Sequence, residues 1–317
     1  MFDQDPTVRS REVGWFIAGA AEAAGMNQLA MARALDWSPS MVSRMISGKR
    51  PVSAENVSGV LGLLRVTGLK RKYAMSLARR ATEHGLTREL GDISAHPGTD
   101  GEIPGRDIMR RLEDMASDVV VFSPNWVPAL LQTEEYISAL MSPDSSVRSD
   151  DITSRVKRRL DRSDDVLNRR PILLFLIGEH ALCRTGPSLE VMSAQVHHLL
   201  RISVRPNVTI QVIPDISGFR ARAKNPYQFM NLTDETTVVC VENETSLLFL
   251  ERDESIKEYA ALTTNLSHLA LDQTETRTWL TALAERLSAQ LDGGDTDGAP
   301  DNEKNKDTGI DNDSQQE

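Results

Sequence analysis

Residues 27–50 carry the pattern of two short helices joined by a tight turn. Asn27 is suited to cap the first helix, because its side-chain oxygen can accept an unpaired N–H of the opening turn. Ser38 is suited to cap the second helix, and Pro39 follows at the first helical position, where a missing N–H costs nothing. Three further residues complete the pattern: the small Ala32, the turn-forming Asp36 and the apolar Val42. This spacing predicts a helix-turn-helix whose second helix leaves its outer face free for the major groove of DNA. An ordinary helical hairpin is the alternative.

Helical patterns also flank this unit. Residues 11–24 place apolar side chains on one helical face, and a glycine follows as a stop signal. Two more helices are predicted at 53–68 and at about 70–83. Short helices with brief loops are typical of a small all-α DNA-binding domain, which we expect over residues 8–90.

The net charge of −10 is unevenly distributed along the chain. Up to residue 91, thirteen Lys and Arg stand against eight Asp and Glu, so this part carries +5 and the remainder −15. A basic head on an acidic body suits attraction to phosphate at one end only.

Composition also bears on the compartment. Cys183 and Cys240 have neither metal-ligand spacing nor a disulfide framework, which favours a reducing compartment. No apolar run approaches the roughly 18 residues that span a membrane, and the first residues lack the pattern of an export signal. We therefore expect a cytoplasmic protein with no membrane partner.

The second half of the chain has a different pattern. Residues 91–105 are rich in Gly, Pro and Asp and predict a linker. Helical patterns then alternate with β-rich runs, which predicts a mixed α/β domain over 106–291. The expected helices are 106–117, 132–141, 151–168, 188–203 and 272–291, and the expected strands are 118–122, 172–177, 208–213, 227–232, 237–242 and 247–250. The last three strands are close in sequence, which favours an antiparallel meander. Residues 292–317 are acidic and almost free of large apolar side chains, so we expect a disordered tail.

The segment Leu35-Asp-Trp-Ser-Pro-Ser-Met-Val-Ser-Arg-Met-Ile-Ser-Gly-Lys-Arg-Pro51 carries most of a family resemblance. Through it, residues 10–66 resemble the XRE-type (lambda-repressor-like) helix-turn-helix regulators. Segments such as Val127-Pro-Ala-Leu-Leu-Gln-Thr-Glu-Glu-Tyr136 are similar to the C-terminal domain of a regulator group abundant in filamentous soil bacteria. The implied fold class is α+β and multidomain: an all-α lambda-repressor-like bundle, a mixed α/β domain and a disordered acidic tail. The resemblance also implies an antitoxin-like regulator with a short partner protein and a C-terminal domain of undefined role.

Three positions depart from this family pattern. Asp36 stands where the turn usually has Gly, although Asp tolerates the left-handed conformation less well. The pair Ile46-Ser47 replaces Glu-Asn after the second helix, and Ala129 replaces the Gly of the Val-Pro-Gly-Leu-Leu-Gln-Thr motif. The first two changes affect the region expected to meet DNA, so they bear on operator preference.

The second helix of the unit provides the predicted base contacts. If it begins at Pro39, Val42 and Met45 point inward and the polar positions lie outside. Arg44 is predicted to bind guanine O6 and N7 in a bidentate pair, with a phosphate-bound or surface role as the alternative. Ser40 can read more than one base. The remaining residues on or beside this helix that we expect at the DNA are Ser38, Ser43 and Met41, whose alternative role is core packing.

Phosphate contacts are expected around this helix. Gln28, at the start of the preceding helix, is placed to donate to a backbone phosphate. Lys49 and Arg50 can neutralise phosphates without reading sequence. Arg9 and Arg11 are predicted either to contact DNA as an arm or to lie in solvent at the N-terminus.

The expected partners are double-stranded DNA and a second copy of the chain, since a single reading helix covers few base pairs. No cofactor and no enzymatic activity are expected, because no phosphate-binding glycine loop, nucleophile motif or Cys-His spacing is present. Glu179 and Glu242 each close a predicted strand, where ligand crevices form in α/β sheets; polar residues at a sheet edge are the alternative. A sensor or partner-binding role is thus predicted for the C-terminal domain, and an antitoxin-like interaction module that uses DNA binding for autoregulation is the second hypothesis.

Overall fold

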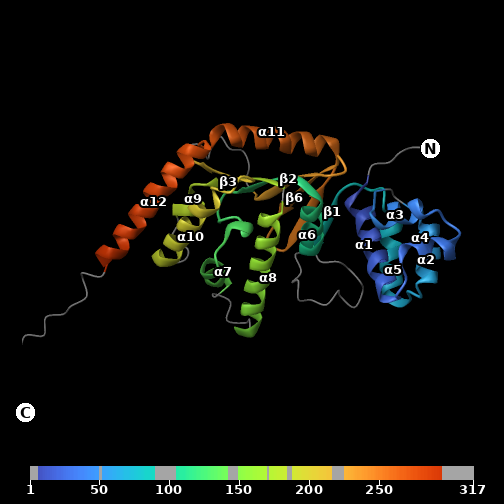
Figure 1. The fold of residues 1–317 in the computed structure, drawn as a ribbon. Coiled ribbons are helices and arrows are strands. Elements are labelled where there is room, and N and C mark those ends of the chain that lie inside the picture. The colour runs from blue at the N-terminus through green and yellow to red at the C-terminus, as the bar shows by residue number, and fades with distance from the viewer. Residues whose placement is uncertain are drawn as a thin grey trace, which may run out of the picture.

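The structure, a computed structural model, describes residues 6–49, 52–89, 105–141, 149–169, 171–183, 188–215 and 225–294. A bundle of short helices lies beside a larger α/β body (Figure 1). The bundle contains α1 (Val8–Ala23), α2 (Gln28–Leu35), α3 (Pro39–Ile46), α4 (Ala54–Leu63) and α5 (Gly68–Arg79). The strands of the body are β1 (Leu86–Glu89), β2 (Ala116–Ser123), β3 (Ile172–Gly178), β4 (Val208–Ile213), β5 (Tyr227–Leu232), β6 (Thr237–Glu242) and β7 (Ser246–Leu250). Its helices are α6 (Gly105–Met115), η1 (Ala129–Leu131), α7 (Glu134–Met141), α8 (Ser149–Asn168), α9 (His180–Cys183), α10 (Leu189–Ile202), α11 (Asp253–Leu269) and α12 (Gln273–Gly294).

Across the described residues of the body, seven strands form one sheet in the order β1-β7-β6-β5-β2-β3-β4. β2, β3 and β4 are parallel, and the other neighbours are antiparallel. The chain runs outward from β2 to β3 and β4 and then returns to β5 on the other side of β2, so the strand order reverses at β2. The expected mixed sheet and the expected meander of β5, β6 and β7 are confirmed.

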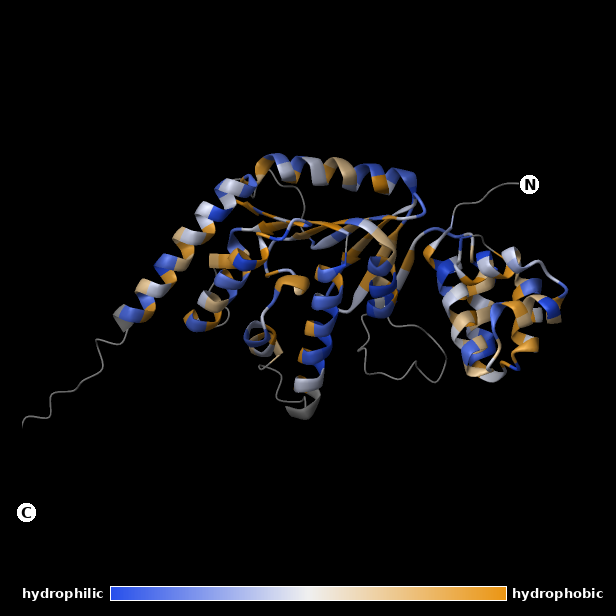
Figure 2. Cartoon of the chain, viewed as in Figure 1, coloured by the Kyte–Doolittle hydropathy of each residue, from blue (hydrophilic) through white to orange (hydrophobic). Residues whose placement is uncertain are grey.

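Both faces of this sheet are apolar because both are covered by helices. On β3, Leu173 and Phe175 belong to the core beneath α6, α8 and α10, whereas Leu176 belongs to the core beneath α11. Successive side chains of a strand point to opposite faces, so one strand contributes to both cores. Figure 1 shows α11 across one face of the sheet and α6, α8 and α10 against the other. In Figure 2 the strands between these layers are mostly orange, the colour of hydrophobic residues.

The sequence does not predict α11, and its packing gives the reason. Within this helix only Leu266 is buried, while Ile256, Tyr259 and Leu262 are half-buried against the sheet. A helix that contacts a sheet through only a narrow apolar side has a weak apolar periodicity. Apolar periodicity is the main signal by which a sequence indicates a helix.

The bundle has its own core. Ile17, Met31, Val42 and Leu61, from four different helices, are fully buried in it. The helical patterns expected at 11–24, 53–68 and 70–83 correspond to α1, α4 and α5, and the fold class of a helical bundle followed by a mixed α/β domain is confirmed.

Strand β1 joins the bundle to the sheet. The sequence predicts no strand at residues 86–89, yet β1 pairs antiparallel with β7, with Leu86 opposite Phe249. Of the expected linker, residues 91–104 lie outside the described residues. The same holds for residues 295–317 of the expected acidic tail, whereas α12 carries the last helix to Gly294.

Candidate DNA interface

The turn between α2 and α3 is built by local hydrogen bonds. Asn27 caps α2, because its Oδ1 accepts the backbone N–H of Ala30 at 2.9 Å. At the other end of α2, Asp36 adopts the left-handed conformation with φ 54° and ψ 43°. Asp is one of the few non-glycine residues that enter this conformation, since its short polar side chain can bond locally. The cap and the left-handed turn confirm the predicted helix-turn-helix geometry.

Helix α3 begins where the sequence predicts, and it buries the face that the sequence predicts to be buried. Ser38 caps it, with Oγ accepting the backbone N–H of Met41 at 3.2 Å, and Pro39 occupies the first turn. Val42 and Met45 are buried at 0% and 1% exposure. The residues of the opposite face are exposed, and they are Ser38, Ser40, Ser43 and Arg44. Since apolar and polar positions alternate with the helical period, α3 is anchored by one face and presents the other to solvent.

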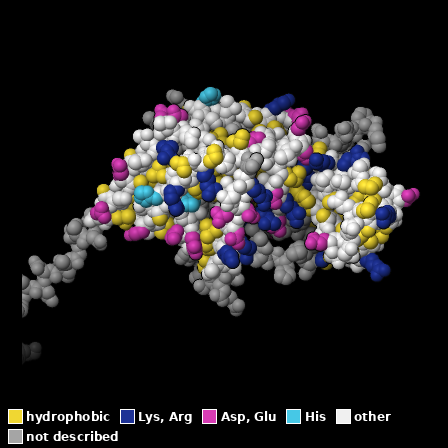
Figure 3. Space-filling view, viewed as in Figure 1, with side chains coloured by type: hydrophobic (Ala, Val, Ile, Leu, Met, Phe, Trp, Pro, Cys, Tyr) yellow, Lys and Arg dark blue, Asp and Glu magenta, His cyan; other side chains and the backbone are white. Residues whose placement is uncertain are grey.

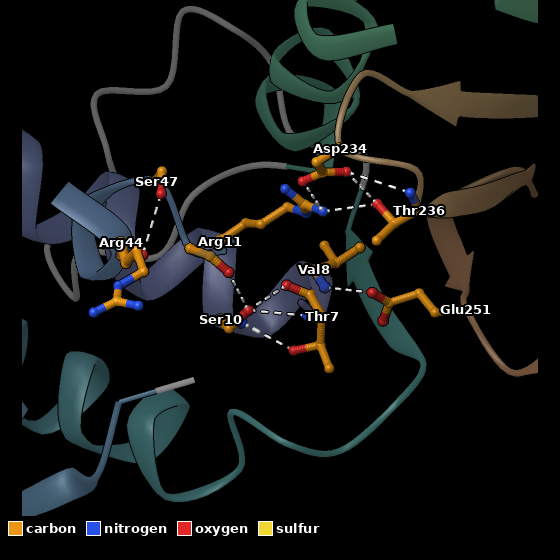
Figure 4. Close-up of polar contacts among 10 residues, drawn as sticks. Thr7, Val8, Ser10, Arg11, Arg44, Ser47, Asp234, Thr236 and Glu251 are labelled. Atoms are coloured by element: carbon orange, nitrogen blue, oxygen red, sulfur yellow. Dashed lines mark hydrogen bonds and ion pairs between the residues drawn. The ribbon is translucent and has the colours of Figure 1, made fainter. Parts of the chain in front are cut away.

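Arg44 lies over the first turn of α3. Its Nε donates to the carbonyl of Ser40 at 3.3 Å, and its Nη2 lies 3.4 Å from Ser40 Oγ. In Figure 4 the guanidinium of Arg44 points away from Arg11 and Asp234. This placement brings the guanidinium to the N-terminal end of α3; in helix-turn-helix proteins, the N-terminal residues of the second helix reach the base edges first.

Two glycines allow α1 and α3 to approach closely. A Cβ on Gly14 would lie 2.4 Å from the carbonyl oxygen of Ile46, and one on Gly48 would lie 2.3 Å from the Cα of Arg11. Gly48 also has φ +66°, which side-chain-bearing residues rarely adopt. Ser10 Oγ donates to the carbonyl of Gly48 at 2.9 Å, so α1 holds the C-terminal end of α3 in place.

The remaining predicted contact residues are Gln28, Met41, Lys49 and Arg50. Gln28, at the first position of α2, is exposed, and so is Lys49 after α3. Met41 is half-buried, a position compatible with either of the roles predicted for it. Arg50 lies outside the described residues.

The prediction for Arg9 and Arg11 is wrong. Both residues are buried in the junction between the bundle and the body, not in a solvated or DNA-contacting arm. Nη2 of Arg9 donates to the carbonyl of Gly85 at 2.9 Å, and Nη2 of Arg11 lies 2.9 Å from Oδ2 of Asp234. Sequence places Arg11 near other basic residues, but the acidic partner comes from a distant part of the chain. The basic head therefore offers DNA less positive charge than its composition suggests.

Acidic residues of the body complete this junction (Figure 4). Glu251, just after β7, accepts the backbone N–H of Val8 at 2.5 Å and that of Gly85 at 3.4 Å. Burial raises the pKa of Glu251 to about 7, although these two hydrogen bonds favour its charged form. Val8 itself belongs to the core of the body. The start of α1, which holds α3, is thus fixed to the sheet by apolar and polar contacts.

The two glutamates predicted to close strands have different surroundings. Glu179, after β3, accepts the backbone N–H of Asp215 through its Oε2 at 2.9 Å, so it ties two loops together. Glu242, at the end of β6, lines a cavity of about 450 Å³. Among the described residues, no group of three or more His, Cys, Asp and Glu is arranged to hold a metal ion. No helix in the described ranges has the length and apolar character needed to cross a membrane.

The fold and this surface define a class of protein: an XRE-like helix-turn-helix DNA-binding regulator in which a mixed α/β domain follows the reading unit. The family described as "Helix-turn-helix" matches residues 17–69, which include α2 and α3. The family described as "Domain of unknown function (DUF5753)" matches residues 107–282, more than half of the chain. The chain belongs to this DUF5753 family.

No curated protein matches the chain. Among solved structures, the chain is similar to TrmBL2, an archaeal chromatin protein whose structure is described as showing a novel mode of DNA binding. The identity is 10% and the TM-score 0.29, and the similarity covers 68% of this chain and 60% of TrmBL2.

Proposed function

We propose that this chain is a sequence-specific transcriptional regulator that inserts α3 into the major groove of DNA. The observation that carries the proposal is the division of α3 into a buried face, with Val42 and Met45, and an exposed polar face, with Ser40 and Arg44. Ser40, Ser43 and Arg44 are all exposed to solvent, so a duplex can reach this face.

The base contacts come from side chains of α3. Arg44 binds guanine O6 and N7, and Ser40 and Ser43 contact neighbouring base edges. Met41 contacts a thymine methyl group with its exposed part. Gln28 and Lys49 bind phosphates on either side of the groove, which positions α3 without reading sequence. Arg50 is expected to join Lys49 in this role.

Two further parts of the proposal concern the rest of the chain. The protein works as a dimer, because two reading helices about 34 Å apart reach successive turns of the groove and one helix covers few base pairs.

The C-terminal domain is a non-enzymatic receiver of a signal. The junction between the bundle and the body supports this role. Because α1 is fixed to the sheet and also holds α3, a change in the body can reorient the reading helix. A short partner protein, as in antitoxin-like systems, stays a prediction.

A duplex selected from a random library by the purified protein tests the proposal. Arg44→Ala should weaken binding to the selected duplex by about 5- to 150-fold, which corresponds to the roughly 1–3 kcal/mol of a bidentate guanine contact, and should relax preference at that base pair. Lys49→Ala should weaken all duplexes similarly and reduce the slope of log affinity against log salt by about 0.9. Lys257→Ala, which removes an exposed positive charge from α11, is the matched control.

Three results would contradict the proposal. Failure of the parent protein to select or bind any duplex at low salt rejects the regulator itself. Unchanged base preference after Arg44→Ala rejects the role of that residue. Equal losses in Arg44→Ala and Lys257→Ala would mean that only net charge matters, and α3 would then not be a reading helix.

A further inference from the structure

A cavity of about 450 Å³ opens at the carboxyl end of β2. Its walls come from the segment after β2, the ends of β5 and β6, and α8, and they include Ser123, Trp126, Gln132, Arg159, Glu242 and Glu244. This volume lies within the range of pockets that bind small molecules. The place in the fold is also significant, because ligands of open α/β sheets bind outside the carboxyl ends of strands, and both β2 and β6 end at this cavity.

Arg159 brings to this cavity a positive charge that has no direct partner. Within the described part of the chain, its guanidinium has no hydrogen bond and no ion pair. Burial and the like charges of Arg106 and Arg162 lower the pKa of Arg159 to about 10, against the opposite effect of Glu242. Arg162 is already satisfied, because its Nε and Nη2 donate to both carboxylate oxygens of Glu113 at 3.0 and 2.5 Å. Arg159 is therefore the cation of this group that an incoming anion would neutralise.

Gln132 adds an unused acceptor. This residue is only 5% exposed, and its Nε2 donates to the carbonyl of Val127 at 2.7 Å. Its Oε1 is buried and accepts no hydrogen bond from the described residues. A buried amide oxygen without a donor is costly, so a ligand or a water that donates to it is favoured. Gln132 also borders a smaller cavity of about 210 Å³. Arg159 and Glu242 line the larger cavity and not the smaller one, so substitutions at these two residues distinguish binding in the larger cavity from binding in the smaller.

The rim carries the opposite charge. Glu242 and Glu244 are exposed beside the opening, and Glu242 has only a distant ion pair with Arg106 at 3.8 Å. Two carboxylates repel a multiply charged anion such as a nucleotide, whereas they attract the cationic end of a small ligand. Trp126, 53% exposed, supplies an aromatic surface at the same cavity. Figure 3 shows Lys and Arg side chains interleaved with Asp and Glu on the face of the body that contains α6.

We propose that this cavity binds a small zwitterion of the α-amino-acid type. The carboxylate of the ligand pairs with Arg159, its ammonium group faces Glu242 and Glu244, and its apolar side chain packs on Trp126. The proposal deepens the receiver role proposed for the C-terminal domain by naming the ligand class, but the binding itself does not depend on DNA.

Binding is tested without DNA, by screening the proteinogenic amino acids one at a time for an increase in melting temperature and titrating the best binder by calorimetry. For that amino acid, two analogues are titrated: the amine that lacks the carboxylate and the acid that lacks the ammonium group. Each analogue should bind at least tenfold more weakly. An absence of any stabilising amino acid would overturn the proposal, and equal affinity for the deaminated acid would overturn the zwitterion assignment.

Substitutions locate the site. Arg159→Gln should weaken the best amino acid at least tenfold while raising the melting temperature of the ligand-free protein, because it removes a desolvated charge. A merely structural Arg159 would lower that temperature instead. Lys157→Gln, exposed on the same helix, is the control and should change neither value. If Arg159→Gln does not fold, Glu242→Gln, at an exposed position, must weaken binding of the amino acid more than binding of its deaminated analogue. Unaltered affinity in both variants refutes the site. DNA binding by the same samples is measured separately, so that loss of the regulator function and loss of the ligand site remain distinguishable.

Discussion

Replacing Arg11 with Met should destabilise the protein by about 3 kcal/mol, because it removes one partner of a buried ion pair. Arg11 is completely buried, and its Nη2 lies 2.9 Å from Asp234 Oδ2 and donates to Thr236 Oγ1 at 2.8 Å. Met retains an unbranched apolar stem, so the change mainly removes the charge and its hydrogen bonds.

The size of the expected loss of stability depends on how completely the groups of the ion pair are hydrogen-bonded. Breaking a buried ion pair from one side costs about 3–5 kcal/mol, since a charge is left behind without its partner. Nε and Nη1 of Arg11 donate to no acceptor in the described part of the chain, so part of the cost of burying this guanidinium is already uncompensated. The expected loss therefore lies at the lower end of that range. For a chain of 317 residues, whose entropy of unfolding is about 2.1 cal/mol/K per residue, it corresponds to a fall of about 5 °C in melting temperature.

The pH dependence of the same pair has a definite sign. Burial by itself would raise the pKa of Asp234, but the hydrogen bond from Thr236 and the charge of Arg11 outweigh it, so the pKa is lowered. A lowered carboxyl pKa contributes stability that is present above the unfolded-state value of about 4 and is lost as the pH falls through the folded-state value. The difference between the parent and Arg11→Met should therefore shrink on acidification.

Urea unfolding followed by tryptophan fluorescence measures this loss. Trp15 is a suitable reporter, because the guanidinium of Arg111 on α6 lies 5.3 Å from the centroid of its ring, across the junction. Arg80→Ala is the control: its partner is Glu83, the two side chains are 57% and 49% exposed, and such surface pairs contribute about 0–1 kcal/mol.

A double-mutant cycle identifies the interaction. Arg11→Met combined with Asp234→Asn should cost less than the sum of the two single changes, because the second change removes the charge that the first left unpaired. Additive losses, or a loss for Arg11→Met no larger than that for Arg80→Ala, would refute the account of this junction.

Two further predictions concern Glu251 and Asp36. The raised pKa of Glu251, about 7 against an unfolded-state value near 4.5, means that its contribution is fully present below about pH 4.5 and is lost as the pH rises through 7. Glu251→Gln should remove up to about 3 kcal/mol of this pH dependence, at roughly 1.4 kcal/mol per pKa unit. Unfolding curves at pH 5 and pH 8 measure it. An equal difference between the two pH values in parent and variant would contradict the prediction. Asp36→Gly should stabilise the bundle by up to about 1 kcal/mol, because Gly adopts the left-handed conformation without steric cost. A lower melting temperature for this variant would instead show that the Asp36 side chain holds the turn.

Much of the fold could be predicted from local pattern. The limits of β4, β5 and β6 coincide with the runs expected at 208–213, 227–232 and 237–242, because each run is apolar enough for a buried strand and is bounded by turn residues. The caps Asn27 and Ser38 could likewise be predicted, since a cap bonds to a backbone N–H only three residues away.

The junction could not be predicted in this way. β1 has only four residues and pairs with β7, and both Arg11 and Glu251 find their partners 166 or more residues away in the chain. Nothing within a short window of sequence distinguishes an arginine that will meet Asp234 from one that will meet phosphate. The same holds for the cavity, where Gln132, Arg159 and Glu242 come from three separate elements.

The sequence alone therefore determined the helix-turn-helix, the faces of α3 and the alternation of strands and helices, because these depend on interactions between near neighbours. Tertiary structure decided which basic residues remain free for DNA, how the reading unit is held against the sheet and where a small molecule has room to bind. The physical reason is that burial and charge pairing act through space, and the groups they bring together are set by the packing of the whole chain.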